Sequence, residues 1–124
     1  MAKKILVIDD EDLIIRSLAK LIKKCGYDIA VSGSCEEALI KIVHFEIDLI
    51  ISDIRMPEIN GIETIRKIYE KLILNNCNKI PVIFITGYAD KEMEENAKIL
   101  NPVGYIYKPF DIKEIKILID EVFK

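Results

Sequence analysis

Short apolar runs alternate along this chain with longer segments of helical periodicity, and this alternation constrains the fold more than any other feature of the sequence. Four of the runs are rich in Ile and Val and almost free of polar residues, which is typical of strands covered on both faces. They span residues 5–8, 49–51, 82–85 and 103–107. A fifth, more polar run at residues 27–31 suits an edge strand. We therefore expect five strands, each followed by a helix.

The segments between these runs are predicted to be helices, because apolar residues recur in them at the period of a helix. The stripe of the first helix comprises Ile14, Leu18, Leu21, Ile22 and Cys25, and that of the third comprises Ile62, Ile65, Tyr69, Leu72 and Ile73. Three helix starts carry a capping residue three positions before a Glu; these pairs are Ser34 with Glu37, Asn60 with Glu63, and Asp111 with Glu114. Gly26 follows the first helix, where a helix-ending glycine is common.

A strand-helix alternation of this kind favours an α/β fold with a parallel sheet, since right-handed crossovers place helices on both faces. The 124 residues fit one compact domain, and neither an internal repeat nor a linker divides them. In open parallel sheets, ligands bind beyond the carboxyl ends of the strands, where the winding reverses. The residues at those ends are therefore the first candidates for a functional site.

Charge and cysteine content exclude several classes of function. The net charge of −3, from 18 Lys and Arg against 21 Asp and Glu, gives no electrostatic footprint for nucleic acid. No apolar run approaches the roughly 18 residues of a membrane span, and residues 5–8 are too few for the core of a signal peptide. Cys25, Cys35 and Cys77 are odd in number and widely spaced, which indicates free thiols. We expect a cytoplasmic domain that binds neither nucleic acid nor membranes.

Four of the predicted strands end in residues that carry a charge or a hydroxyl group. These ends are Asp9-Asp10-Glu11-Asp12, Ser52-Asp53, Thr86-Gly87 and Lys108-Pro109. Each could have a local role by itself: the aspartates as a helix cap or a turn former, the threonine as a β-branched strand end, the lysine as a surface charge. Their common position at one rim of the sheet is better explained by a shared site.

The chemistry of this rim favours a metal-dependent phosphoryl site. Two charges about 5 Å apart repel by roughly 3 kcal/mol at an effective dielectric near 20, so clustered carboxylates hold either protons or a cation. Oxygen ligands suit a hard ion such as Mg²⁺. A carboxylate can also attack phosphorus and form an aspartyl phosphate, while a metal and a lysine neutralise charge on the phosphoryl oxygens.

In these motifs the sequence resembles the receiver domain of two-component response regulators, over residues 4–123. The matching motifs, in order and spacing, are Ile8-Asp9-Asp10-Glu11, Asp53-Ile54-Arg55-Met56-Pro57 followed by Gly61, Thr86-Gly87, and Lys108-Pro109-Phe110. The resemblance implies an α/β, flavodoxin-like (βα)5 fold: a doubly wound, five-stranded parallel sheet with strand order 2-1-3-4-5. It also implies a cis peptide bond between Lys108 and Pro109, a state that proline makes accessible.

The resemblance assigns the acceptor and the metal ligands residue by residue. Asp53 would be the phosphoryl acceptor. Asp10, Asp53 and the backbone carbonyl of Arg55 would bind Mg²⁺ or Mn²⁺, and Asp9 would reach the metal through water. The loop after Asp53 would be shaped by its Met-Pro pair and by Gly61.

A second group of residues would respond to phosphorylation. Lys108 would bind the phosphoryl group, Thr86 would move onto it, and Tyr105 would swing inward into the space that Thr86 leaves. The face formed by the fourth helix, the fifth strand and the fifth helix would then change its affinity for a partner. Such a domain is a signalling switch that catalyses only its own phosphorylation and dephosphorylation.

The resemblance also implies partners. The phosphoryl donor would be a sensor histidine kinase or a phosphotransfer protein, with small acyl phosphates as further donors, and an output domain or protein would read the switched face. A phosphorylation-dependent homodimer stays open. It also stays open whether residues 1–124 are a stand-alone receiver or the N-terminal part of a longer regulator.

Three alternative functions compete with this interpretation. A haloacid-dehalogenase-type phosphatase also uses a strand-end aspartate, but it requires a second aspartate two residues later, where this chain has Arg55. A flavodoxin-like domain that binds FMN requires a phosphate loop after the first strand, where the four acidic residues of this chain would repel a phosphate. A receiver-like binding module that takes no phosphate is disfavoured by the intact acidic set.

Other conspicuous residues are predicted to be ordinary surface features. His44, the only histidine, falls near the end of the second helix with no second ligand at metal-binding spacing. Tyr107 is expected to be an exposed strand residue. Residues 90–96 are highly charged and predict a solvated face on the fourth helix, with a thin apolar stripe at Met93, Ala97 and Leu100.

Overall fold

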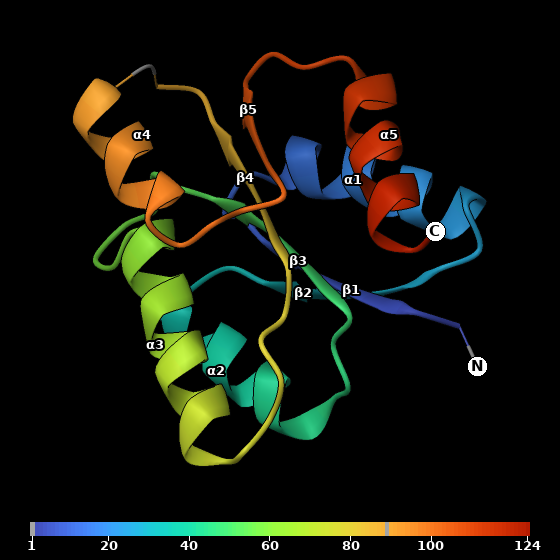
Figure 1. The fold of residues 1–124 in the computed structure, drawn as a ribbon. Helices are drawn as coiled ribbons and strands as arrows, with labels where there is room; N and C mark the ends of the chain where they lie inside the picture. The colour runs from blue at the N-terminus through green and yellow to red at the C-terminus, as the bar shows by residue number, and fades with distance from the viewer. Residues whose placement is uncertain (1, 89) are drawn as a thin grey trace.

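The computed structural model describes residues 2–88 and 90–124, and in it strands and helices alternate along the whole chain (Figure 1). The strands are β1 (Lys4–Ile8), β2 (Asp28–Ser32), β3 (Leu49–Asp53), β4 (Val82–Thr86) and β5 (Gly104–Tyr107). The helices are α1 (Asp12–Lys24), α2 (Cys35–His44), α3 (Gly61–Leu74), α4 (Lys91–Lys98) and α5 (Ile112–Val122). None of the helices in the described ranges is long and apolar enough to cross a membrane.

The five strands form one parallel sheet in the order β2-β1-β3-β4-β5, which confirms the predicted α/β, flavodoxin-like topology. β1 lies between β2 and β3, with Ile8 opposite Ser32 on one side and opposite Ser52 on the other. The winding of the chain reverses between β1 and β3. A crevice is expected at the carboxyl ends of these two strands, because the connections that leave them go to opposite faces of the sheet.

Two layers of helices cover the sheet: α1 and α5 on one face, and α2, α3 and α4 on the other (Figure 1). β3 and β4 are buried along their whole length, as their unbroken apolar runs predict. β2 is a partly exposed edge strand, also as predicted. β5 differs from the prediction of a strand covered on both faces. It forms the opposite edge, so Ile106 is its one buried residue and Tyr107 is 43% exposed.

The helix starts follow the capping signals of the sequence with two differences. The side chains of Ser34 and Asn60 accept hydrogen bonds from the backbone three residues later, as predicted. Asp111 caps α5 through Lys113 and not through Glu114. α4 has a cap that was not predicted: the carboxylate of Asp90 accepts hydrogen bonds from the first turn of the helix.

The buried faces of the helices agree with the predicted stripes apart from one residue. The stripe of α1 packs against the sheet as expected. In α3, Ile73 is 73% exposed, and Ile68 takes its place in the core. The three cysteines are free thiols, as predicted. His44 and Tyr107 are exposed, also as predicted.

Gly61, the first residue of α3, lies directly against the backbone of Asp53. A Cβ atom at this position would stand 1.9 Å from the carbonyl oxygen of Asp53, and the amide of Gly61 donates a hydrogen bond to the carbonyl of Ile54 at 2.8 Å. Neither contact leaves room for a side chain. The glycine therefore lets the loop after β3 fold back tightly on the strand end.

We predict that Gly61→Ala destabilises the fold by more than about 2 kcal/mol, because the clash is with backbone that cannot rotate away. Gly87→Ala is the matched control: its Cβ would meet the Lys108 side chain at 3.8 Å, which is ordinary contact. Urea unfolding of both variants measures the effect. Equal stability of the two variants would show that the loop does not pack as described.

Candidate functional site

The predicted acidic residues meet at the carboxyl ends of β1 and β3. Asp9 and Asp10 directly follow β1, and Asp53 is the last residue of β3. One carboxylate oxygen from each lies within 4.8 Å of the other two. Asp9 and Asp53 are buried, whereas Asp10 is exposed. The adjacency of β1 and β3 thus brings together residues that lie more than forty positions apart in the sequence.

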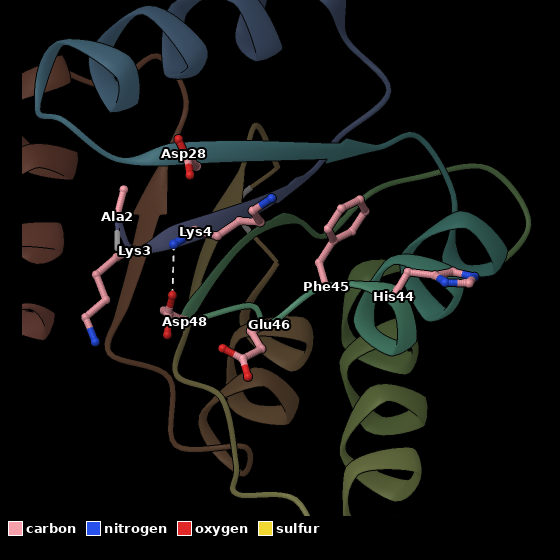
Figure 2. A pocket seen from close by; sticks show the side chains of 8 residues that line it. All are labelled: Ala2, Lys3, Lys4, Asp28, His44, Phe45, Glu46 and Asp48. Carbon is pink, nitrogen blue, oxygen red and sulfur yellow. Dashed lines mark hydrogen bonds between the residues drawn. The ribbon is translucent and has the colours of Figure 1, made fainter.

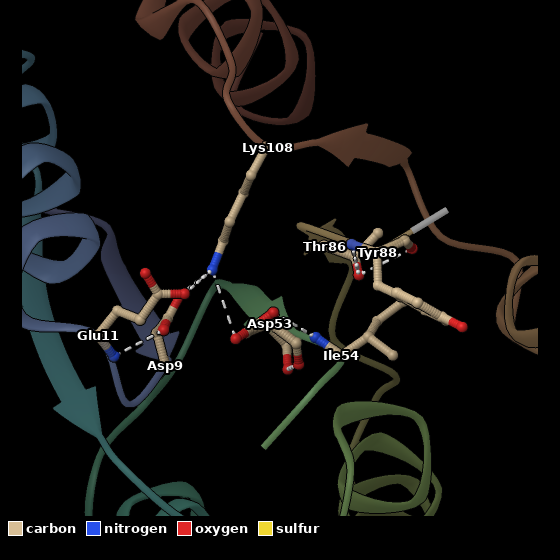
Figure 3. Close-up of polar contacts among 8 residues, drawn as sticks. Asp9, Glu11, Asp53, Ile54, Thr86, Tyr88 and Lys108 are labelled. Atoms are coloured by element: carbon tan, nitrogen blue, oxygen red, sulfur yellow. Dashed lines mark hydrogen bonds and ion pairs between the residues drawn. The ribbon is translucent and has the colours of Figure 1, made fainter. Parts of the chain in front are cut away.

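Lys108 reaches this cluster from the end of β5 (Figure 3). Its ammonium nitrogen lies 3.4 Å from a carboxylate oxygen of Asp9 and 3.4 Å from one of Asp53. A third carboxylate, that of Glu11, is closer, at 2.8 Å. The peptide bond between Lys108 and Pro109 is cis, as predicted. The side chain of Lys108 is only 11% exposed, so its charge acts mainly on the carboxylates.

Asp53 sits at the centre of the site and is 3% exposed. One of its carboxylate oxygens accepts a hydrogen bond from the amide of Ile54 at 2.8 Å, and the other faces Lys108. The hydroxyl of Ser52 donates to the carbonyl of Asp53 at 2.9 Å. These contacts, together with Gly61, hold both the backbone and the side chain of Asp53 in place.

The electrostatic balance of the site is strongly negative. The pKa of Asp53 is raised to about 6, first by burial and then by the charge of Asp9, although Lys108 opposes both effects. Burial also raises the pKa of Asp9, against the hydrogen bond from the amide of Glu11 and the charge of Lys108. Four carboxylates, counting Asp10 and Glu11, thus face one ammonium group.

The donor set fits a hard divalent cation. Three carboxylates lie close together and supply the oxygen ligands that such an ion requires. A single ammonium group cannot neutralise all three, so the site keeps an excess of negative charge. Within residues 2–88 and 90–124, no hydrogen bond uses the backbone carbonyl of Arg55. The cluster of Asp9, Asp10 and Asp53 could therefore hold a metal ion, as the sequence predicts.

Thr86 is fully buried at the end of β4. Its hydroxyl accepts a hydrogen bond from the amide of Tyr88 at 3.2 Å and donates to the carbonyl of the same residue at 3.3 Å. It is therefore occupied by the following loop and not by Asp53 (Figure 3). The guanidinium of Arg55 stacks over the ring of Tyr88 at 4.4 Å, which joins the loop after β3 to the loop after β4.

Tyr105 lies in β5, with its hydroxyl buried and without a hydrogen-bond partner among the described residues. Its ring is tilted against Phe84 at 6.5 Å and meets Tyr107 edge-on at 5.5 Å. Burial raises the pKa of Tyr105 to about 12. Tyr107 donates a hydrogen bond to Glu94, so this exposed strand residue also ties β5 to α4. A buried hydroxyl with no hydrogen-bond partner is energetically unfavourable.

Glu11 is a member of the site that was not assigned a role from the sequence. It occupies the N-cap position of α1, but its side chain makes no cap hydrogen bond to the helix. Its amide donates to Asp9 at 2.9 Å and its carboxylate pairs with Lys108. One signal in the sequence could have indicated such a role. Glu is a weak N-cap residue and stands where Asp, Asn, Ser or Thr is usual.

The opposite end of the sheet offers a different kind of cavity, of about 600 Å³ (Figure 2). It is lined by Ala2, Lys3, Lys4, Asp28, His44, Phe45, Glu46 and Asp48. Charges of both signs alternate around it, and Asp48 is already engaged as an acceptor for the amide of Lys4 at 2.8 Å. None of the residues predicted for the phosphoryl site lies there.

Comparison with known proteins agrees with this geometry. The family model for the response regulator receiver domain matches residues 5–120. The receiver protein of Pseudomonas putida, a solved crystal structure, superposes with a TM-score of 0.88 at 25% identity and covers 98% of both chains.

Two curated relatives have longer chains. The transcriptional regulatory protein CrdR of Helicobacter pylori is 29% identical over 123 residues, covering 99% of this chain and 56% of CrdR. The alkaline phosphatase synthesis transcriptional regulatory protein PhoP of Bacillus subtilis is 30% identical over 125 residues, covering 100% of this chain and 50% of PhoP. This chain spans about half the length of either relative. With a family match over nearly its whole length, the chain belongs to the receiver domains of two-component response regulators.

Proposed function

We propose that Asp53 is the residue that accepts the phosphoryl group. The observation that carries this proposal is the position of its carboxylate, which is nearly buried, lies 3.4 Å from the ammonium of Lys108 and stands beside the carboxylates of Asp9 and Asp10. A carboxylate in this place has a cationic group ready to receive phosphoryl oxygens and neighbours that would recruit a metal.

The same cluster would hold Mg²⁺ or Mn²⁺, with Asp10, Asp53 and the backbone carbonyl of Arg55 as direct ligands and Asp9 acting through water. When bound, the ion would neutralise negative charge on the phosphoryl group. The support for this assignment is the excess of carboxylates over ammonium groups and the oxygen-only donor set. Lys108, whose ammonium lies 3.4 Å from both Asp9 and Asp53, would supply a second positive charge.

The reaction is a phosphoryl transfer. A carboxylate oxygen of Asp53 attacks the phosphorus of a phosphohistidine, the phosphorus–nitrogen bond breaks, and the imidazole leaves with the electron pair and takes up a proton. With acetyl phosphate the phosphorus–oxygen bond breaks and acetate leaves. Hydrolysis resets the domain, because the oxygen of water then bonds to phosphorus and Asp53 leaves as a free carboxylate.

Phosphorylation would shift the population between two conformations. The new charge on Asp53 attracts the hydroxyl of Thr86, which must first leave the backbone of Tyr88. Tyr105 would gain from the space that Thr86 vacates. Because Tyr105 packs on Tyr107, and Tyr107 is bonded to Glu94, the change would reach α4 and the face of α4, β5 and α5.

The donor would be a sensor histidine kinase or a phosphotransfer protein, and small acyl phosphates would also serve. The chain would act in the cytoplasm as a switch and not as a turnover enzyme. Residues 1–124 would form one receiver domain, either alone or as the N-terminal part of a longer regulator, and the switched face would bind an output domain, another protein or a second copy. The family match gives no support to the phosphatase or FMN-binding alternatives.

We predict that acetyl phosphate and Mg²⁺ add one phosphoryl group to the wild-type protein and none to Asp53→Asn, because the variant lacks the nucleophile. Chelation of the metal should abolish the reaction as well. Intact-protein mass spectrometry measures the product. Glu46→Gln is the control, since it removes an exposed carboxylate at the far end of the sheet and should leave phosphorylation unchanged. Labelling of Asp53→Asn at the wild-type rate would refute the assignment.

A second prediction concerns stability. The folded protein holds the Asp53 proton more tightly than the unfolded chain does, because its pKa is about 6 in place of 3.8. The contribution of Asp53 to stability therefore falls as the pH rises from about 4 to about 6 and stays at the lower level above that. Without metal at about pH 7.5, Asp53→Asn should be more stable than the wild type by on the order of 2 kcal/mol, and this advantage should shrink toward pH 4.

Urea unfolding across this pH range, with and without Mg²⁺, tests the second prediction. Mg²⁺ should stabilise the wild type and narrow the gap to Asp53→Asn, while Glu46→Gln should follow the wild type throughout. If Asp53→Asn is less stable than the wild type at every pH, the charged form of the Asp53 carboxylate does not destabilise the fold, and the prediction is wrong.

A further inference from the structure

We propose that Glu11 is a positioning residue for Lys108: it holds the ammonium group at the rim of the site and competes with the phosphoryl group on Asp53 for it. This inference rests on the proposed function of Asp53. It concerns a residue outside the cluster of Asp9, Asp10 and Asp53 that would hold the metal.

The distances establish which partner Lys108 prefers in the unphosphorylated site. Its nitrogen is 2.8 Å from Glu11, a normal hydrogen-bond length, and 3.4 Å from both Asp9 and Asp53, at the outer limit for such a bond. Lys108 is thus bonded most closely to Glu11, which is the most exposed of its three carboxylate partners. Figure 3 shows the nitrogen with Glu11 and Asp9 on one side and Asp53 on the other.

The backbone conformation of Glu11 leaves its side chain free to pair with Lys108. Its φ and ψ of −97° and 114° are extended, as at other N-cap positions, yet the side chain does not cap α1. The amide of Glu11 is fixed by its hydrogen bond to Asp9, so the carboxylate has only to span the gap to Lys108. The link joins residues 97 positions apart in the sequence.

The exposure of the two partners explains why the contact can be exchanged. The side chain of Glu11 is 57% exposed, so water can take over its hydrogen bonds when Lys108 leaves. Lys108 is 11% exposed and remains within the site. A phosphoryl group on Asp53 would present more negative charge than the free carboxylate and draw the ammonium inward. Glu11 therefore disfavours the phosphorylated state, by a free energy of the size of one exposed ion pair.

The test is the affinity of the protein for beryllium trifluoride, a phosphoryl mimic, at saturating Mg²⁺, followed by NMR or calorimetry. Glu11→Gln should bind the mimic about three-fold more tightly than the wild type, in proportion to an exposed ion pair. Glu11→Asp keeps the charge but is one methylene shorter, so it should shift in the same direction. Asp12→Asn removes the neighbouring exposed charge, which has no ion pair with Lys108 in the described ranges, and should bind like the wild type.

A double-mutant cycle completes the test, because a positioning residue acts only through its partner. In a Lys108→Ala background, Glu11→Gln should no longer change the affinity for the mimic. Equal shifts in Glu11→Gln and Asp12→Asn, with none in Glu11→Asp, would reveal a general charge effect and overturn the inference. Wild-type affinity in Glu11→Gln would overturn it while leaving the role of Asp53 intact. Failure of the wild type itself to bind the mimic would overturn both.

Discussion

The site depends on electrostatic repulsion between carboxylates that the fold brings together and neutralises only in part. Parallel strands β1 and β3 bring Asp9, Asp10 and Asp53 to the same rim, where their oxygens lie within 4.8 Å of one another. Lys108 offsets part of this charge and shares its ammonium with Glu11. The remaining negative charge means that the cluster could hold a metal ion.

The rest of the molecule keeps this stressed arrangement in place. The apolar runs of β3 and β4 are buried on both faces, so the strand that carries Asp53 is fixed by packing. Gly61 allows the next loop to close against the backbone of Asp53. α4 and β5 are held less firmly: Ala97 is the one buried residue of α4, and β5 is an edge strand. Rigidity around Asp53 beside weaker anchoring of α4 and β5 suits the switch proposed above.

The sequence predicted the fold, and it predicted which charged residues meet at the rim of the sheet, because both leave local signals. Five apolar runs gave the strands, and charged residues at their ends identified the rim. Prediction was less successful where long-range packing decides the outcome. Ile73 fits the helical period of α3 but lies on its exposed side, and Ile68 is buried in its place. The exposure of β5 depends on its position at the sheet edge, which the composition of the run does not reveal.

Two contacts between distant side chains could not be predicted. The pairing of Glu11 with Lys108 and the bond between Tyr107 and Glu94 depend on how loops and helices are placed relative to one another. The same holds for Thr86, whose hydroxyl is bonded to the backbone of Tyr88 in this structure.

The central claim, that the buried carboxylate of this rim is the phosphoryl acceptor, is tested most directly by locating the phosphoryl group. Borohydride reduces an aspartyl phosphate to homoserine, which peptide mass spectrometry can assign to one position. After phosphorylation with Mg²⁺ present, the account predicts homoserine at position 53 and unmodified aspartate at positions 9 and 10. Homoserine at position 9 or 10, or a stable phosphoryl group on another type of residue, would contradict it.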